Sequence, residues 1–336
     1  MKKYIFKRII TGIIVLLGVI TITFIMARVI PSDPAAKWVG PKATPEQIAM
    51  AEKELGLDKP MPVQYANYIR DLLKGNLGRS LRTKQPITQE LAAYIPATLE
   101  IVIFGFLLAV IIGIPLGIYS AKQKDKMLDH VSRFFSIGSV SLPAFWVALF
   151  LQLVFYKKLG LLPLGGRLSL ETTIFYNVPD ITGMLLLDSL ITSNFMIFKD
   201  AFIHIILPGI TIALYPIGLV ARMTRSALLE VLNEDYIASI RSYGVSETKV
   251  LWKYALKNTL GPTATVLTLS LGYTLVNTFL IETIFSWPGL GNYVATAVTT
   301  LDYPAIIGVT IFSATCYVIL NLIADLIIAL DPRIRL

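Results

Sequence analysis

The residue types that carry enzyme chemistry are scarce in this chain of 336 residues. The two histidines, His130 and His204, lie far apart, and the single cysteine, Cys316, cannot form an internal disulfide. His204 and Cys316 are expected to be packing residues. The sequence has no G-x-x-x-x-G-K-[ST] loop, G-x-S-x-G elbow, H-E-x-x-H pair or C-x-x-C pair. We therefore expect no catalytic residue, no metal site and no cofactor in this chain.

Polar residues within or next to the apolar segments could instead serve a transport path: Glu100, Asn277, Glu282, Asn321 and Asp325. Asn277, Glu282 and Asn321 are the translocation-path candidates. Glu282 precedes an aromatic turn and is expected at the outer mouth of a span, where it could meet a peptide amino group or a metal ion. Otherwise it caps a helix or pairs within the protein. Asp325 is expected to pair with local cations or helix ends.

The composition points to a membrane protein. Hydrophobic residues make up 55% of the chain, charged residues 15%, and the mean hydropathy is +0.67. Stretches of about 20 apolar residues can cross a membrane as helices. Six stretches qualify: Ile9–Ile30, Ala97–Ala121, Phe134–Tyr156, Phe202–Val220, Thr263–Ile281 and Ala305–Leu330. The sequence thus predicts an all-α membrane protein with six transmembrane helices.

The basic residues orient these spans. With an internal N-terminus, the cytoplasmic segments hold 16 Lys and Arg in 68 positions, against 13 in 134 positions outside. Both termini are therefore expected in the cytoplasm, and the net charge of +8 fits a membrane surface rather than nucleic acid. The first span is longer than the apolar core of a signal peptide and is expected to remain as an anchor. Residues 181–198 are expected to be interfacial or re-entrant, because a seventh span would place the basic 221–262 loop outside.

The segment after the first span predicts a small helical cap outside the membrane. Thr44 is an N-cap with Pro45 and Gln47 behind it, so a helix should run to about Leu55 and stop at Gly56. A second amphipathic helix is expected over Val63–Lys74, ended by Gly75. The cap is either a scaffold over the helix ends or a docking surface for an external partner.

The cytoplasmic loop 221–262 predicts a protruding elbow. Asn233 should cap a helix over Glu234–Tyr243, which Gly244 ends. Ser246 should cap a second helix, Glu247–Leu260, stopped by Gly261-Pro262. An elbow of this kind can receive force from a partner that holds its helix in a groove. The alternative is a basic amphipathic hairpin lying on anionic lipid.

Short motifs spread over almost the whole chain carry a family resemblance. They are Ile30-Pro-Ser-Asp-Pro-Ala35, Leu55-Gly-Leu-Asp-Lys-Pro60, Gly75-Asn-Leu-Gly78, Ala221-Arg-Met-Thr-Arg-Ser226, Glu234-Asp-Tyr-Ile237, Phe285-Ser-Trp-Pro-Gly-Leu-Gly291 and Asp331-Pro-Arg-Ile-Arg335. With them, the chain resembles the inner-membrane permease subunits of ABC importers. More narrowly, it is similar to the first-permease type of the dipeptide, oligopeptide and nickel group.

The resemblance implies the type I importer fold. It places a first transmembrane helix at 1–30, an extracytoplasmic helical cap at 31–92, the transmembrane domain at 93–330 and a cytoplasmic tail at 331–336. It further implies four kinds of partner in a prokaryotic inner membrane. These are the lipid bilayer, a second similar permease, two ATP-hydrolysing subunits that bind ATP and Mg, and an external substrate-binding protein.

In such permeases the elbow carries a motif whose helix docks into the ATP-hydrolysing subunit. Carried over, the coupling segment is about Asp235–Val250, with Gly244 as the motif glycine. Positions 238–240 read Ala-Ser-Ile where the family pattern has Glu-Ala-Ala. The implied coupling residues are Asp235, Tyr236, Ile237, Ala238, Arg241, Ser242, Tyr243, Gly244, Val245, Ser246 and Glu247.

The overall resemblance favours di- and oligopeptides as substrates. Nickel or another small solute, carried by the same architecture, is the alternative. An ion-coupled secondary transporter or channel is a rival of another class, but it would place ionisable residues near the midplane of the membrane. Here they cluster at the span ends. A membrane scaffold without transport would leave the elbow and the internal Gly and Pro residues without a use.

Overall fold

The computed structural model describes residues 2–29, 33–40 and 42–330. Its helices are α1 (Lys2–Val29), α2 (Pro34–Val39), α3 (Pro45–Glu54), α4 (Met61–Leu73), α5 (Ile87–Leu108), α6 (Ile114–Lys122), α7 (Met127–Ser141), α8 (Ala144–Leu151), α9 (Leu170–Phe175), α10 (Leu185–Ile191), α11 (Phe195–Leu232), α12 (Asp235–Ser242), α13 (Glu247–Lys249), α14 (Leu256–Ile284), α15 (Leu290–Thr300) and α16 (Tyr303–Leu330). Three π-helical segments join them: η1 (Ala109–Gly113), η2 (Gln152–Lys158) and η3 (Val250–Ala255). The described residues form no strand, which confirms the all-α class. The predicted tail, 331–336, lies outside the described residues.

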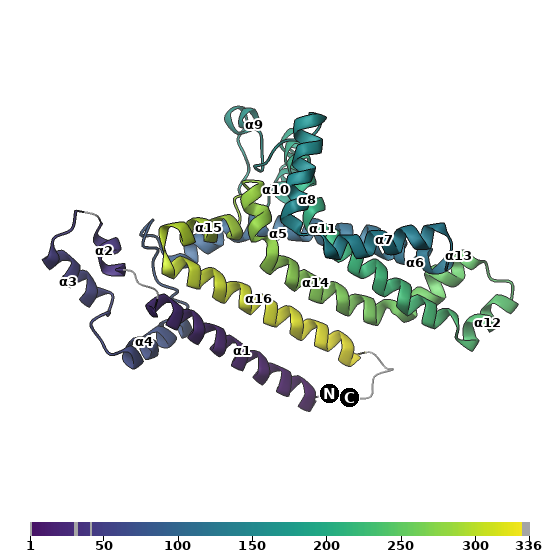
Figure 1. Cartoon of the computed structure of the whole chain (residues 1–336), viewed down its shortest axis with the longest axis horizontal. Helices are drawn as coiled ribbons and strands as arrows, with labels where there is room; N and C mark the ends of the chain where they lie inside the picture. The colour runs from purple at the N-terminus through teal and green to yellow at the C-terminus, as the bar shows by residue number, and fades with distance from the viewer. Residues whose placement is uncertain (1, 30–32, 41, 331–336) are drawn as a thin grey trace.

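Five helical stretches are long and apolar enough to cross a membrane. Among the described residues they are Ile5–Met26, Ile87–Lys122, Phe195–Leu232, Glu247–Ile284 and Tyr303–Ile327. The bent pair α7 and α8–η2 is a sixth if its two arms form one broken span. The cap helices α2–α4 lie at one end of this bundle and α12 at the other (Figure 1). Cap and elbow are therefore separated by the length of the spans.

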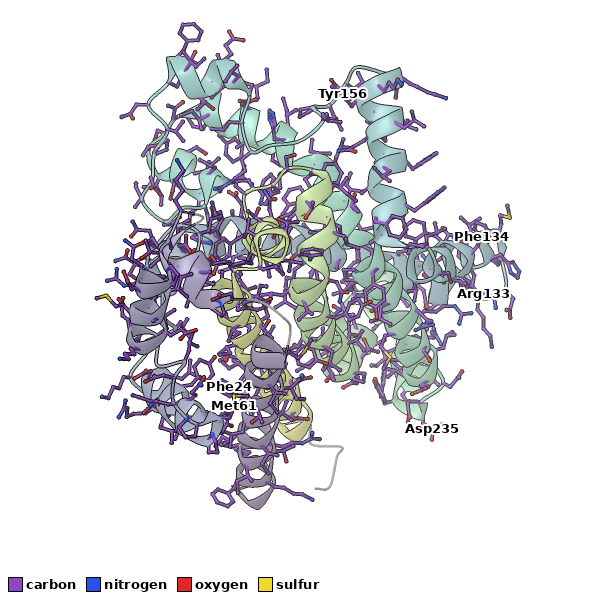
Figure 2. The ribbon with its side chains drawn as sticks, turned by 60° about the vertical axis from the view of Figure 1, so that its left-hand side comes forward. Phe24, Met61, Arg133, Phe134, Tyr156 and Asp235 are labelled. Atoms are coloured by element: carbon purple, nitrogen blue, oxygen red, sulfur yellow. The ribbon has the colours of Figure 1, made fainter. Side chains whose placement is uncertain are left out.

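The third span is not the single helix over Phe134–Tyr156 that the sequence predicted. α7 and α8 meet at 106°, so Phe134 and Tyr156 lie on different arms (Figure 2). Leu142 is extended between the arms, with φ −76° and ψ 132°. It precedes Pro143, and the proline ring disfavours helical geometry in the residue before it. The break at this proline is the physical reason for the bend.

α11 is the central helix of the bundle. Of the residues in its most apolar stretch, 67% are buried. The corresponding share is 6% for α1 and 11% for α16. α11 packs against α5, η1, α6, α7 and α14. The remaining spans are arranged around it, with α1 and α16 side by side at the edge of the bundle (Figure 1).

A row of small residues brings α5–η1–α6 close to α11. Gly105, Ala109, Gly113 and Gly117 recur every four residues, on one face of the helical stretch. A Cβ added to Gly105 would lie 2.8 Å from Ile212 Cγ2, and one on Gly117 would lie 2.7 Å from the carbonyl oxygen of Ala221. Membrane helices associate through such small residues because close backbones gain van der Waals contact.

The helix after the elbow does not stop at Gly261-Pro262, as the sequence predicted. α13, η3 and α14 form one helical stretch from Glu247 to Ile284. Thr259 and Thr263 are buried on either side of Pro262, and the Thr263 hydroxyl lies 3.5 Å from that of Thr224 on α11. Packing against α11 thus keeps the helix continuous past Pro262. A break at this position would leave backbone polar groups unpaired in hydrocarbon.

The two helices predicted for the cap are present. The second begins at Met61 rather than Val63, because Pro62 lies in its first turn, where proline is tolerated. Thr44 and Gln47 form a capping box at the start of α3, with N···O distances of 3.0 and 3.3 Å. Gly56 and Gly75 have φ of +64° and +77° directly beyond the ends of α3 and α4. These are the left-handed positions that glycine adopts at helix ends.

Replacing Gly117 by Ala should destabilise the bundle. The new Cβ would contact the backbone of α11, which has to shift, so we expect a loss of about 1–3 kcal/mol in the free energy of unfolding. The measurement is the thermal unfolding of the purified protein in detergent. Gly138→Ala on α7 is the matched control, because its Cβ would have no neighbour within 4 Å. If the Gly117→Ala protein unfolds at a temperature no lower than that of the control, the close contact between the helices is contradicted.

Candidate functional site

The elbow between α11 and α14 turns at Gly244. Its φ is +73°, and a Cβ there would have no neighbour within 4 Å, so the turn needs glycine for its backbone geometry alone. Asn233 does not cap α12 as predicted; it ends α11, and Glu234 occupies the N-cap of α12 without a side-chain hydrogen bond. Ser246 occupies the N-cap of α13, also without such a bond. The predicted helix–glycine–helix order is confirmed.

An ion pair closes the elbow across its turn. Arg241 donates from Nη2 to Glu247 Oε1 at 2.8 Å and from Nε to Oε2 at 3.2 Å. A bidentate guanidinium–carboxylate pair fixes the relative orientation of both groups. The pair joins the last turn of α12 to the first residue of α13 and thereby stiffens the elbow.

The elbow is anchored to the bundle through an apolar cluster. Ile237 is fully buried, together with Val250 and Leu251 from the segment that follows the turn. They pack against Ile118 at the end of α6 and Leu228 at the end of α11. A displacement of the elbow must therefore move the ends of both helices.

Most of the other predicted coupling residues point away from this cluster. Val245 is half-buried, and the exposed ones are Asp235, Tyr236, Ala238, Arg241, Ser242, Tyr243, Gly244, Ser246 and Glu247. Tyr243 is 87% exposed, more than any other large side chain of the elbow. Asp235, the first residue of α12, is labelled in Figure 2 and lies at the far end of the elbow. The elbow thus presents a rigid, exposed face with an aromatic residue at its turn.

A groove of about 320 Å³ lies between α7, α8, α11 and α14. Asn277 lines it, with Tyr215 and Tyr273, whose ring centroids are 4.7 Å apart. The residues that line the groove are apolar or uncharged polar; among the described residues no charged side chain lines it. Amide and hydroxyl groups of this kind form hydrogen bonds with a polar solute without requiring it to carry one sign of charge.

The three path candidates do not come together. Only Asn277 lines the groove. Asn321 is half-buried on α16 and donates from its amide nitrogen to the carbonyl oxygen of Tyr317 at 3.0 Å. Glu282 is fully buried at the end of α14. Which residues line the assembled path stays a prediction.

Glu282 caps α15 from within the protein, one of the alternatives that the sequence left open. It accepts hydrogen bonds from the Gly291 N–H at 2.6 Å and from the Thr98 hydroxyl at 2.7 Å. A Cβ on Gly289 would lie 2.4 Å from Glu282 Oε2, so the glycine makes room for the carboxylate. The Trp-Pro-Gly-Leu-Gly turn is therefore built around a buried acid, and Trp287 fastens it by donating to Ala97 O at 2.8 Å.

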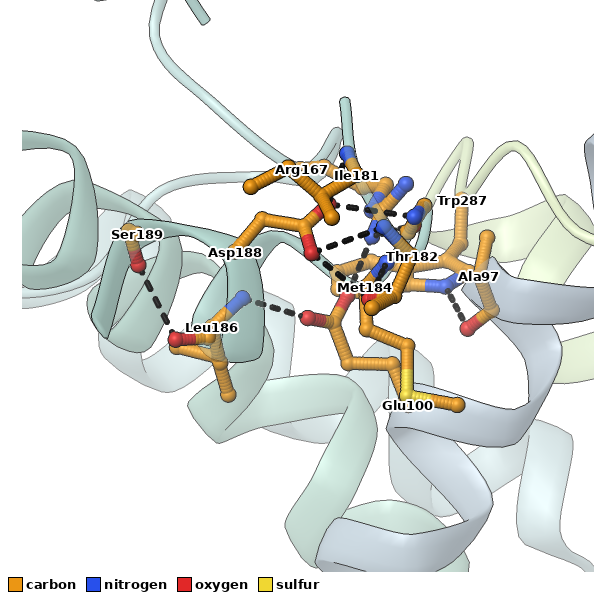
Figure 3. Close-up of polar contacts among 11 residues, drawn as sticks. Ala97, Glu100, Arg167, Ile181, Thr182, Met184, Leu186, Asp188, Ser189 and Trp287 are labelled. Atoms are coloured by element: carbon orange, nitrogen blue, oxygen red, sulfur yellow. Dashed lines mark hydrogen bonds and ion pairs between the residues drawn. The ribbon is translucent and has the colours of Figure 1, made fainter. Parts of the chain in front are cut away.

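A second buried acid, Glu100, holds the loop between η2 and α11, which was predicted to lie outside the membrane and is named the outer loop. It lies 2.5 Å from Arg167 Nη2 and accepts from the Leu186 N–H at 2.7 Å (Figure 3). Arg167 also donates to Gly183 O at 2.9 Å. The stretch 181–198 forms α10, a short turn and the first residues of α11, with no span of its own. Charge-assisted contacts thus tie this outer loop to α5.

Asp188 organises the same loop from its other side. Its carboxylate accepts from the N–H groups of Ile181, Thr182 and Gly183 at 3.1, 2.9 and 3.0 Å (Figure 3). Burial raises the pKa of Asp188, but these hydrogen bonds and that of the Thr182 hydroxyl lower it more, so the pKa lies below its ordinary value. The stabilisation is complete above the ordinary aspartate pKa of about 3.9 and is lost as the pH falls through the lowered value.

The end of the bundle near the elbow has a clamp that sequence reasoning missed. Arg225 on α11 contacts Asp129 on α7 through two hydrogen bonds of 2.6 and 2.7 Å. The Ser120 hydroxyl of α6 donates to the same carboxylate at 2.6 Å. Asp129 is fully buried and lies far from Arg225 in sequence, so no local spacing relates them. The chain therefore has one buried ion pair near each end of its central helices.

The remaining polar predictions concern packing. Asp325 pairs with Arg8 at 3.2 Å, which joins α16 to α1 and confirms the expected local cation. His204 is buried, and its Nδ1 lies 2.8 Å from the carbonyl oxygen of Asp200, as expected for a packing residue. Cys316 is half-buried in α16.

The chain is similar to a well-defined group of known proteins. Residues 113–336 match the model of the family described as binding-protein-dependent transport system inner membrane component, and residues 1–102 match the model of its N-terminal region. A probable D,D-dipeptide transport system permease of Escherichia coli is 43% identical over 96% of this chain and 94% of its own length. A dipeptide transport system permease of Alkalihalophilus pseudofirmus is 41% identical over the full length of both, and a glutathione transport system permease of Salmonella choleraesuis is 32% identical over 100% of this chain and 99% of its own.

Glu282→Ala should destabilise the protein more than Asn277→Ala. The first change leaves the buried donors of Gly291 and Thr98 without an acceptor, which costs about 1–3 kcal/mol. The second removes an exposed amide and should change the free energy of unfolding by less than about 0.5 kcal/mol. Thermal unfolding in detergent measures both. Equal melting temperatures for the two variants would contradict the capping role of Glu282.

Proposed function

Because the chain belongs to the family of binding-protein-dependent transport system inner membrane components, we propose that it forms half of the translocation path of an ATP-driven importer of dipeptides and short peptides. The other half is a second, similar permease. Two ATP-hydrolysing subunits bind ATP and Mg and supply the energy. An external binding protein delivers the substrate.

The elbow is the observation that carries this proposal. Its exposed residues, among them Tyr243 and Ser242, dock into a cleft of an ATP-hydrolysing subunit, and its buried residue Ile237 transmits the motion. The Ala-Ser-Ile sequence at 238–240 leaves the elbow without the glutamate of the family pattern. The pair Arg241–Glu247 supplies a fixed charge arrangement on the same face instead.

The orientation follows from the basic residues of the elbow. Under the positive-inside rule, Arg241, Lys249, Lys253 and Lys257 support a cytoplasmic elbow with both termini on the same side. The cap at the opposite end then lies outside the inner membrane of a prokaryote, where the binding protein arrives.

The groove supports a peptide as the substrate. Peptides present amide groups and both signs of charge, and the groove offers Asn277 and tyrosine hydroxyls with no charge of its own among the described lining residues. The names of the similar permeases in Escherichia coli and Alkalihalophilus pseudofirmus give dipeptides as their cargo. Nickel is the weaker alternative, because the described lining residues include no histidine, whose imidazole suits this metal.

Transport proceeds by alternating access. ATP binding closes the pair of ATP-hydrolysing subunits, and each elbow moves with the cleft that holds it. α6 and α11 follow, because Ile118 and Leu228 pack on the elbow, and the groove changes the side to which it opens. A secondary transporter would instead need an ion site in the groove, whose lining carries no charge among the described residues.

Gly244→Asp should uncouple ATP hydrolysis from transport. An aspartate at φ +73° strains the turn by about 1 kcal/mol and adds a negative charge at the docking face. Peptide uptake by proteoliposomes containing the whole complex should fall about tenfold, with membrane insertion unchanged. Gly244→Asn is the matched control, because asparagine strains the backbone to a similar extent but adds no charge. Normal uptake by the aspartate variant would contradict the role of the elbow.

A crosslink from position 242 should identify the motor. In a Cys316→Ala background, Ser242→Cys gives a single exposed thiol on the elbow. Treatment of membranes with a short thiol-to-amine crosslinker should join this chain to an ATP-hydrolysing subunit. Ser169→Cys on the outer loop is the control and should give no such product. The absence of a nucleotide-hydrolysing partner from the Ser242→Cys product would refute the proposed function.

A further inference from the structure

A cavity of about 330 Å³ between the cap and the outer ends of α1 and α16 has no part in the groove or the elbow. Its walls include four aromatic side chains, Phe24, Trp38, Tyr68 and Tyr303. Phe24 and Tyr68 stack at 5.6 Å between ring centroids. Rings gathered in this way bind ammonium groups through their electron-rich faces.

The cavity has charges of both signs. Glu54, Asp71 and Arg79 line it. The ammonium group of Lys84 lies 4.1 Å from the ring centroid of Trp38, but Lys84 does not line the cavity. Arg70 approaches Asp71 only to 3.9 Å in an exposed contact of little strength. Two carboxylates and one guanidinium complement a ligand that has an ammonium group and an anionic group.

Two hydroxyl groups in the cavity wall lack partners. The hydroxyls of Tyr68 and Tyr303 are buried and form no hydrogen bond with any described residue, and Tyr303 is only 6% exposed. A buried donor without an acceptor costs about 1–3 kcal/mol, so a ligand with acceptor oxygens would be stabilised here. Burial raises the pKa of Tyr68, and the nearby Tyr65 raises it further. The hydroxyl therefore stays protonated and can donate a hydrogen bond.

The cavity lies at the level of the membrane interface. Phe24 is two residues from the end of the apolar stretch Ile5–Met26, and Tyr303 begins the stretch Tyr303–Ile327. Phe24 and Met61 in Figure 2 mark where the cap meets α1. Aromatic residues at such positions lie among lipid headgroups.

We propose that this cavity binds the headgroup of a phosphatidylethanolamine from the leaflet on the cap side of the membrane. The ammonium lies among the aromatic rings, next to Glu54 and Asp71. The phosphate oxygens accept hydrogen bonds from Tyr68 and Tyr303 and pair with Arg79. The lipid thereby joins the cap to α1 and α16 and completes the hydrogen bonding of the cavity wall.

The test is a titration of the purified full chain with dihexanoyl phosphatidylethanolamine, followed by native mass spectrometry and thermal unfolding. Dihexanoyl phosphatidylglycerol, which lacks the ammonium, should bind about tenfold more weakly. Tyr303→Phe and Asp71→Asn should each weaken phosphatidylethanolamine binding about tenfold, because each removes a group that contacts the headgroup. Without lipid, Tyr303→Phe should be no less stable than the wild type, since it removes an unpartnered hydroxyl.

Asp58→Asn is the control, an exposed acid of the cap that does not line the cavity, and it should bind the lipid like the wild type. Equal affinity for the two lipids, or unchanged binding by both cavity variants, would overturn the proposal. The last experiment uses dialanine as a competitor, because it also carries an ammonium and an anionic group. Displacement of the lipid by dialanine at comparable concentration would identify a peptide site and likewise overturn the lipid assignment.

Discussion

The close approach of two helix backbones, α5–η1–α6 against α11, determines the geometry of the rest of the molecule. Hydrocarbon offers no hydrophobic effect to hold helices together, so contact has to come from shape. Gly105, Gly113 and Gly117 provide it on one side of α11. Gly218 does the same on another side, where a Cβ would lie 2.9 Å from the carbonyl oxygen of Ser136 on α7. The groove and the elbow both take their positions from this helix pair.

Two buried ion pairs fasten neighbouring elements to the two members of this helix pair. Glu100–Arg167 fastens the outer loop to α5, and Asp129–Arg225 fastens the start of α7 to α11. Breaking a buried pair leaves an uncompensated charge, which costs several kcal/mol, so both clamps resist local bending. In the proposed mechanism, motion that enters at the elbow would therefore move the wall of the groove as a body.

Local signals in the sequence were sufficient for the cap and the elbow but not for the long-range contacts. Thr44, Gly56 and Gly244 act on their own neighbours, and their helix boundaries were predicted correctly. Pro143 breaks a span while Pro262 lies within a helix, and the local sequence around the two prolines does not distinguish these outcomes. The partners of buried acids, such as Thr98 for Glu282 and Arg225 for Asp129, lie too far along the chain for any periodicity to relate them.

The groove gives a physical reason to expect another protein beside this chain. Asn277 and Tyr273 are exposed along it, although α14 lies at the depth of the membrane. In hydrocarbon, polar groups without partners cost several kcal/mol each, so this face cannot be covered by lipid tails. The neighbouring arm α8 exposes Phe145, Trp146 and Phe150, which suit packing against another apolar helix. A second protein with a matching polar strip, as in the proposed importer, would satisfy both surfaces and enclose a path between the two strips.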